Sequence, residues 1–342
     1  MKKLGVFLVY SLCLISCSTI IPIFTKKKLA SQSFSSLATS ADHYFWKHFH
    51  EGNYDSIPQI LHLLKAAYIE NPNNATLAAH IGFTHAWALS ERIRLPKPSA
   101  NVIDHATLAN KYFKEAMQLD PSDIRLKGFH GDFLMSEGSI DQDQKKIVKG
   151  YLETKKVARQ WPEWGDFTLS YPLSLSNKTD KRFQESIDLM WHNADACAYE
   201  KVDREHLDWK KYYPLLNTDL TEKNRRACWN TWIAPHNLEG FFIHFGDILI
   251  KSGDLKKGLM MYQNAKSVPE YESYPYKEVV ELRIKNAQEN LQRFNQAIEI
   301  SNGNSNNVLM INSKISCMGC HQKTKYIAPD TSRSYVAPHL KR

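Results

Sequence analysis

Several patterns that identify common enzyme families are missing from this sequence of 342 residues. It has no His-Glu-x-x-His zinc motif, no glycine-rich phosphate loop and no serine nucleophile elbow. Runs typical of β-strands are nearly absent, whereas apolar residues recur at helical spacing, as in Ile57, Ile60, Leu61 and Leu64. We therefore expect an all-α fold, and the missing motifs favour a binding or carrier protein over an enzyme.

A nucleic-acid-binding pattern is missing as well. The net charge is +8, but no basic helix or recognisable nucleic-acid module accompanies it. The charge falls to +6 if Lys2 and Lys3 are removed with a leader. We interpret the remaining excess as diffuse surface charge that keeps protein molecules apart, and we expect no nucleic-acid partner.

Long hydrophobic runs are also lacking. The apolar stretch Leu4–Ile15 is too short to span a bilayer. It follows two lysines and precedes Ser16 and Cys17, an order that is typical of a bacterial export signal. The chain is therefore expected to leave the cytoplasm.

The end of this stretch, Leu14 to Cys17, resembles the lipobox of bacterial lipoproteins. The resemblance implies that residues 1–16 are a signal peptide and that Cys17 is acylated, which anchors the protein in a membrane. Ser18 rather than Asp follows the cysteine, and in that family this implies the outer membrane, facing the periplasm. An ordinary signal peptide, in which Cys17 is merely apolar, is the alternative.

Residues 17–40 are expected to form a lipidated tether. The segment contains Lys26, Lys27 and Lys28, followed by five serines. The lysines could attract anionic lipid head groups, or they could simply keep a linker solvated. Either reading places the folded part of the chain after residue 40.

Residues 41–300 are predicted to form a helical domain with irregular repeats. Asn71–Asn74 and Asp120–Asp123 both punctuate helices. Gly131–Gly138 matches Gly246–Gly253 in residue class, and each of these two segments is predicted to be the first helix of a repeat with its closing turn, while His80–Leu89 is a weaker copy. These features resemble tetratricopeptide repeats, which implies antiparallel helix pairs that dock a partner protein. A helical bundle without repeats is the alternative.

Aromatic residues are concentrated between Trp161 and Trp232. Aromatic side chains in such number could line a ligand groove or pack against a porphyrin, or they could form an ordinary core. The sequence leaves both interpretations open.

The run Cys317-Met318-Gly319-Cys320-His321 carries the clearest chemistry. Two cysteines separated by two residues can reach two vinyl groups of a porphyrin, and the histidine that follows can bind the iron. The run resembles the haem-attachment motif of c-type cytochromes, which implies one covalent haem c, with Cys317 and Cys320 as thioether anchors and His321 as the proximal iron ligand. A thiol redox pair, a zinc site and a disulfide are the alternatives.

The cysteines outside this motif are few. Cys13 leaves with the signal peptide and Cys17 carries lipid, so Cys197 and Cys228 remain. In an oxidising periplasm we expect these two to form a structural disulfide, with a pair of buried free thiols as the alternative.

A methionine is missing after the motif, where only 21 residues remain. Residues 301–342 are therefore expected to be a haem-attachment tail and not a complete cytochrome c domain, with Ser301–Asn307 as a loop on which it docks. The sixth iron ligand could come from His339, Met310, His236 or His244, or the iron could lack one; each of these four residues also has an ordinary structural interpretation.

Three functions fit these observations. The first is an exported, membrane-anchored monohaem protein that transfers electrons to a periplasmic partner docked on its repeats. The second is a protein-binding scaffold in which the haem is structural or sensory. The third is a peroxidase-like enzyme with an open iron face, for which the sequence supplies no recognisable distal acid, base or arginine.

Overall fold

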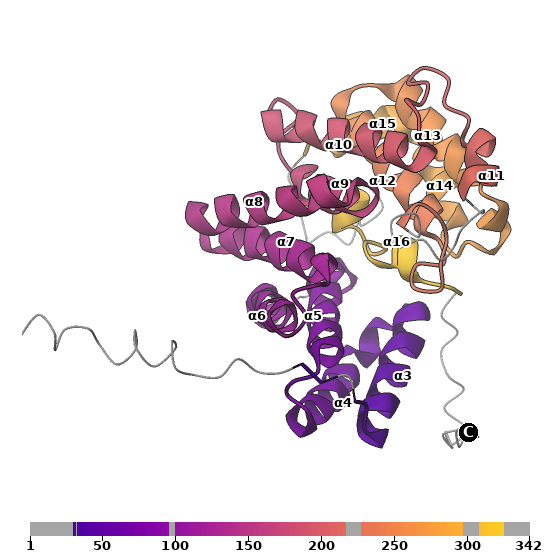
Figure 1. Ribbon diagram of the computed structural model, residues 1–342. Coiled ribbons are helices and arrows are strands. Elements are labelled where there is room, and N and C mark those ends of the chain that lie inside the picture. Colours follow the sequence, from indigo (N-terminus) through magenta and orange to yellow (C-terminus); the bar gives the residue numbers. More distant parts are fainter. Residues whose placement is uncertain (1–29, 32, 96–99, 217–226, 297–307, 325–342) are drawn as a thin grey trace, which may run out of the picture.

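The computed structural model describes residues 30–31, 33–95, 100–216, 227–296 and 308–324 (Figure 1). The predicted signal peptide, Cys17, the Ser301–Asn307 loop and His339 lie outside these ranges. Within them the secondary structure is helical and no strand is present, so the all-α prediction is confirmed. No helix in these ranges is both long and apolar enough to cross a membrane.

Eight helices follow one another in the first part of the array. They are α3 (Ser36–His50), α4 (Ile57–Glu70), α5 (Ala75–Ser90), α6 (Asp104–Leu119), α7 (Ile124–Asp141), α8 (Gln144–Gln160), α9 (Pro162–Leu173) and α10 (Lys181–Ala198). Each packs mainly against its neighbours in sequence, as expected for helices joined by short turns. The result is a curved stack (Figure 1).

The second part of the array closes this curve. It contains α11 (Tyr213–Leu216), α12 (Asn237–Ser252), α13 (Leu255–Ser267), α14 (Lys277–Lys285), α15 (Ala287–Arg293), the 3-10 turn η9 (Met310–Asn312) and the short α16 (Met318–His321). Every residue of α12 from Leu238 to Lys251 is buried, so this helix is the centre of the second part. Figure 1 shows α16 between α3 and α12, both of which it contacts.

Polar capping residues set several helix boundaries. The Asn74 side chain accepts a hydrogen bond from the Leu77 amide (3.0 Å) at the start of α5, and Asp123 accepts one from the Arg125 amide (3.0 Å) at the start of α7. These bonds satisfy backbone donors that have no partner inside the helix. Both turns recognised in the sequence therefore separate helices as predicted.

The two matching glycine segments occupy equivalent helix crossings. A Cβ atom at Gly131 would lie 2.3 Å from the Thr154 hydroxyl of α8, and one at Gly246 would lie 2.4 Å from the Tyr262 ring of α13. Both glycines therefore allow the next helix to approach closely. This shared packing accounts for the similarity between the two segments.

The ends of these segments differ from the expectation. Gly253 does end α12 in a left-handed conformation (φ +109°), but α7 continues through Gly138 and turns only at Gln142 (φ 57°). A Cβ atom at Gly138 would lie 2.8 Å from the Cβ atom of Lys146. The prediction of a turn at Gly138 is wrong because this glycine provides a second close helix contact instead.

A disulfide joins the end of α10 to the segment before α12. Cys197 and Cys228 are both buried, and their Cα atoms are 5.5 Å apart. The bond closes a loop across a sequence separation of 31 residues. It fixes the aromatic-rich connection between the two parts of the array.

We expect the Cys197→Ser, Cys228→Ser double variant to unfold more easily, by about 3–4 kcal/mol, because the unfolded chain gains loop freedom. Urea unfolding followed by circular dichroism measures this difference, and reduction of the unaltered protein should give a comparable loss. Equal stability of the variant and the oxidised protein would contradict a stabilising role for the bond.

Candidate functional site

The Cys-x-x-Cys-His run forms a single tight turn. The amides of Cys320 and His321 both donate to the Cys317 carbonyl, at 3.3 and 3.2 Å. The segment also joins two apolar cores, because Met318 packs in the core of α3–α5 whereas Cys320 packs in the core around α12. The turn therefore lies in the interior of the array.

His321 has one ring nitrogen fixed by the protein. Its Nδ1 lies 2.8 Å from the Ile233 carbonyl oxygen, and since a carbonyl only accepts, Nδ1 must carry the proton. The Nε2 lone pair is then free. Burial lowers the pKa of His321, while the bond to Ile233 opposes that shift, so the ring is neutral at physiological pH. A neutral imidazole with one nitrogen held by an acceptor is the usual form of a metal ligand.

The two cysteines of the turn are free thiols. Burial raises the pKa of Cys317 to about 12, with a further contribution from the Glu91 carboxylate, and burial also raises the pKa of Cys320. Redox-active thiols have lowered pKa values, so these surroundings do not favour a thiol redox pair. Among the described residues, no three His, Cys, Asp or Glu side chains are grouped as a metal site, which gives no support to a zinc site.

Gly240 has no side chain, which lets α12 approach Cys320 closely. A Cβ atom at Gly240 would lie 2.2 Å from the Cys320 Sγ atom. The backbone amide of His236, just before α12, donates to the Cys320 carbonyl (3.0 Å), and the Tyr274 hydroxyl donates to the Gly319 carbonyl (3.0 Å). The second part of the array thus holds the turn from one side.

Glu91 holds the turn from the other side. Its Oε1 accepts from the Met318 amide (3.0 Å), and its Oε2 accepts from the Trp87 indole (3.0 Å) and from Arg94 (2.7 Å). The side chain has no exposed surface. Burial raises the pKa of Glu91, and Arg94 opposes this shift.

A similar cluster binds the segment just before the motif. Asp247 of α12 accepts from the Met310 amide (2.8 Å) and from the Tyr262 hydroxyl (2.7 Å), and it pairs with Arg283 (3.0 Å). Each part of the array therefore contributes one buried carboxylate that binds the segment from Met310 to His321, and each carboxylate is paired with a buried or half-buried arginine.

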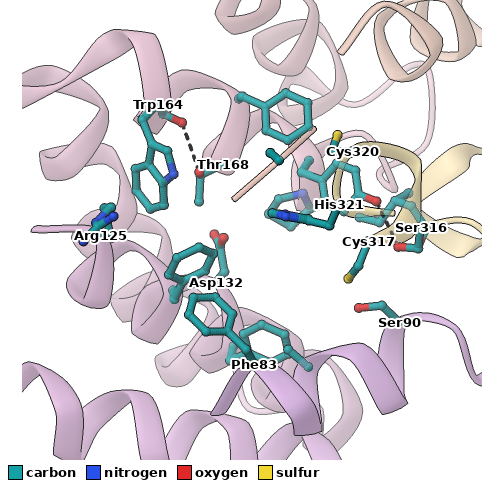
Figure 2. Close-up of a pocket in the computed structure, with 18 of the residues that line it drawn as sticks. Phe83, Ser90, Arg125, Asp132, Trp164, Thr168, Ser316, Cys317, Cys320 and His321 are labelled. Atoms are coloured by element: carbon teal, nitrogen blue, oxygen red, sulfur yellow. Dashed lines mark hydrogen bonds between the residues drawn. The ribbon is translucent and has the colours of Figure 1, made fainter. Parts of the chain in front are cut away.

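A cavity of about 1640 Å³ opens beside the turn. Cys317, Cys320 and His321 line it, and Figure 2 shows Trp164, Thr168, Asp132 and Phe83 around the same space. Typical small-molecule pockets are about 300–1,000 Å³, so this cavity has room for a macrocycle. Its wall is mainly apolar, with aromatic side chains from several helices, among them Phe45, Trp46, Phe49, Phe83, Phe129 and Phe167.

The aromatic residues between Trp161 and Trp232 divide between the lining of the cavity and the ordinary core. Trp164, Phe167 and Tyr171 line the cavity, whereas Trp209 and Tyr212 are buried in the core around α12. Trp232 also lines the cavity but is 61% exposed, and it packs against Trp46 with ring centroids 4.8 Å apart.

The residues considered as a sixth iron ligand lie in different places. Met310 lines the cavity, but its sulfur packs against Gly319 in the attachment turn. His236 is buried with Nδ1 2.9 Å from Glu239, and His244 is buried behind Phe167 and Tyr171. Neither of these histidines lines the cavity, and His339 lies outside the described residues.

Other residues of the site were not singled out as functional from the sequence. They are Glu91, the cavity residues His80 and Asp132, and Asp42, which lies 2.8 Å from His80. His80 and Asp132 belong to segments recognised only as repeats, and Asp132 occupies the position equivalent to Asp247. The aspartate that recurs at the same position of both matching segments was the sequence pattern that could have pointed to Asp132.

Comparison with protein-family models, with curated proteins and with solved structures finds no significant match to this chain.

We expect Glu91→Ala to destabilise the fold by about 3–5 kcal/mol, because it leaves the Met318 amide and the Trp87 indole buried without their acceptor and removes the partner of the half-buried Arg94. Chemical unfolding measures the loss, and amide hydrogen exchange at Met318 should accelerate. The matched control is Glu205→Ala, which removes only exposed pairs with Lys256 and Lys257 and should change little. Unchanged protection of Met318 would contradict the anchoring role of Glu91.

Proposed function

We propose that the protein is an exported, lipid-anchored carrier of one covalent haem c that exchanges electrons with a periplasmic partner. The observation that carries this proposal is the His321 ring at the cavity wall, with Nδ1 held by Ile233 and Nε2 left free. Cys317 and Cys320 would anchor the porphyrin, and His321 would bind its iron.

The residues present fit this group. Both thiols border a large, mainly apolar cavity, as a porphyrin requires, and neither is in a disulfide. Each thioether forms when a cysteine S–H adds across one vinyl double bond, with sulfur bonded to one carbon and hydrogen to the other, so no oxidant is needed. Bound haem would supply a one-electron couple between ferric and ferrous iron.

The surroundings of His321 favour electron exchange. Trp232, which is exposed, immediately precedes Ile233, whose carbonyl accepts a hydrogen bond from the His321 Nδ1–H group. The backbone between Trp232 and the Ile233 carbonyl, followed by one hydrogen bond, therefore connects the protein surface to His321, the proposed iron ligand. The exposed Trp232 ring also gives a docked partner an apolar contact beside this route.

Asp132 favours a second candidate, a haem enzyme. Its carboxyl lines the cavity (Figure 2), and its Oδ1 atom is shielded from solvent without a hydrogen bond to the described residues. Burial raises the pKa of Asp132 well above its ordinary value, with Thr154 opposing the shift, so the group is able to donate a proton. An enzyme of this kind requires an open iron face.

Coexpression with a c-type haem maturation system should give protein that keeps its haem after denaturation. Cys317→Ala and Cys320→Ala should each leave one thioether and shift the pyridine haemochrome band, and the double variant should lose covalent haem. Cys197→Ser, Cys228→Ser is the control that should retain it. Haem-free protein under these conditions would refute the proposal.

The lipid anchor has a separate test. In cells labelled with a fatty-acid analogue, the unaltered protein should carry the label and sediment with membranes, because Cys17 is the proposed acylation site. Cys17→Ala should abolish labelling, and Cys13→Ala should not. Label on the Cys17 variant would contradict the assignment.

A further inference from the structure

His80 is fixed at the cavity wall by residues of α3. The His80 Nδ1 atom lies 2.8 Å from the Asp42 Oδ1 atom, at ion-pair distance, and both atoms are shielded from solvent. The His80 ring stacks on Phe45 (4.5 Å between centroids) and meets the edge of Trp46 (5.3 Å). The orientation of the imidazole is therefore set on three sides.

This arrangement matches that of His321. In both residues Nδ1 faces an acceptor, which is the Asp42 carboxylate for His80 and the Ile233 carbonyl for His321. In both, Nε2 is left without a hydrogen bond to the described part of the chain. A ring held at one nitrogen and free at the other is prepared to bind a metal, and a carboxylate partner makes it a stronger donor.

The position of His80 separates it from the other possible ligands. Among the described residues that line the cavity, His80 and His321 are the histidines, and they come from different helices, α5 and α16. Met310 packs against Gly319 of the turn itself, while His236 and His244 do not line the cavity.

We propose that His80 is the second axial ligand of the haem iron, bound through Nε2, and that Asp42 is its positioning residue. This inference rests on the proposed covalent haem. An iron with two imidazole ligands has no open face for a substrate, so this assignment favours the electron carrier over the enzyme with Asp132 as its acid.

The first test uses holoprotein with covalently attached haem. Electron paramagnetic resonance of the unaltered ferric protein should give the low-spin signal of two imidazole ligands, and carbon monoxide should bind poorly to the ferrous form. His80→Ala should become high-spin and bind carbon monoxide, and added imidazole should restore the low-spin spectrum. His43→Ala, an exposed histidine on α3, should behave as the unaltered protein.

Two further variants distinguish the loss of an iron ligand from the loss of the fold. His80→Met retains a buried side chain that can bind iron, and it should replace the bis-imidazole signal with that of a histidine–methionine pair. Asp42→Asn should remain low-spin but raise the midpoint potential, because a weaker acceptor makes the imidazole a poorer donor. Circular dichroism identifies any variant that has lost its fold.

The outcomes separate the two proposals. Loss of haem from the denatured, unaltered protein refutes covalent attachment itself. Retained haem with a high-spin spectrum, or a His80→Ala variant that is folded and still low-spin, overturns the ligand assignment alone. In the second case a change of spectrum in Met310→Leu, His244→Ala or His236→Ala would identify the actual ligand.

Discussion

The segment from Met310 to His321 is held by two buried carboxylates that accept hydrogen bonds from its backbone. Glu91 accepts from the Met318 amide and Asp247 accepts from the Met310 amide, and each is paired with an arginine that lies close in sequence or in space. A buried carboxylate is stable only when its charge and lone pairs are satisfied. The Met318 and Met310 amides therefore complete the hydrogen-bond partners of Glu91 and Asp247, and these two carboxylates in turn fix the position of the segment.

The hydrogen bond between Glu91 and Met318 links the first part of the helical array to α16. Glu91 and Met318 are 227 residues apart in sequence, and the attachment segment contributes Met318 to one core and Cys320 to the other. The same segment also lines the cavity, through Met310, Cys317 and His321. The contacts that hold the fold together around α16 are therefore also those that shape the site.

Features that depend on local sequence were predictable. Apolar periodicity indicated helices, and Asn74 and Asp123 marked helix starts because capping involves residues only a few positions apart. The cysteine motif was equally local. Gly138 was misread as a turn because a glycine that ends a helix and one that permits a close crossing look the same in sequence. The pairing of His80 with Asp42, and of Glu91 with Met318, joins distant segments through packing that no spacing rule encodes.

The close contact between Gly240 and Cys320 has a consequence for biogenesis. In the folded chain α12 lies directly against the Cys320 sulfur, and burial raises the pKa of both thiols of the motif. If haem is attached as proposed, the enzyme that joins it to these sulfurs needs them accessible and reactive, so attachment would take place before α12 packs against the turn. Cofactor insertion would then precede the final collapse of the array, and the porphyrin would be the template around which its two parts meet.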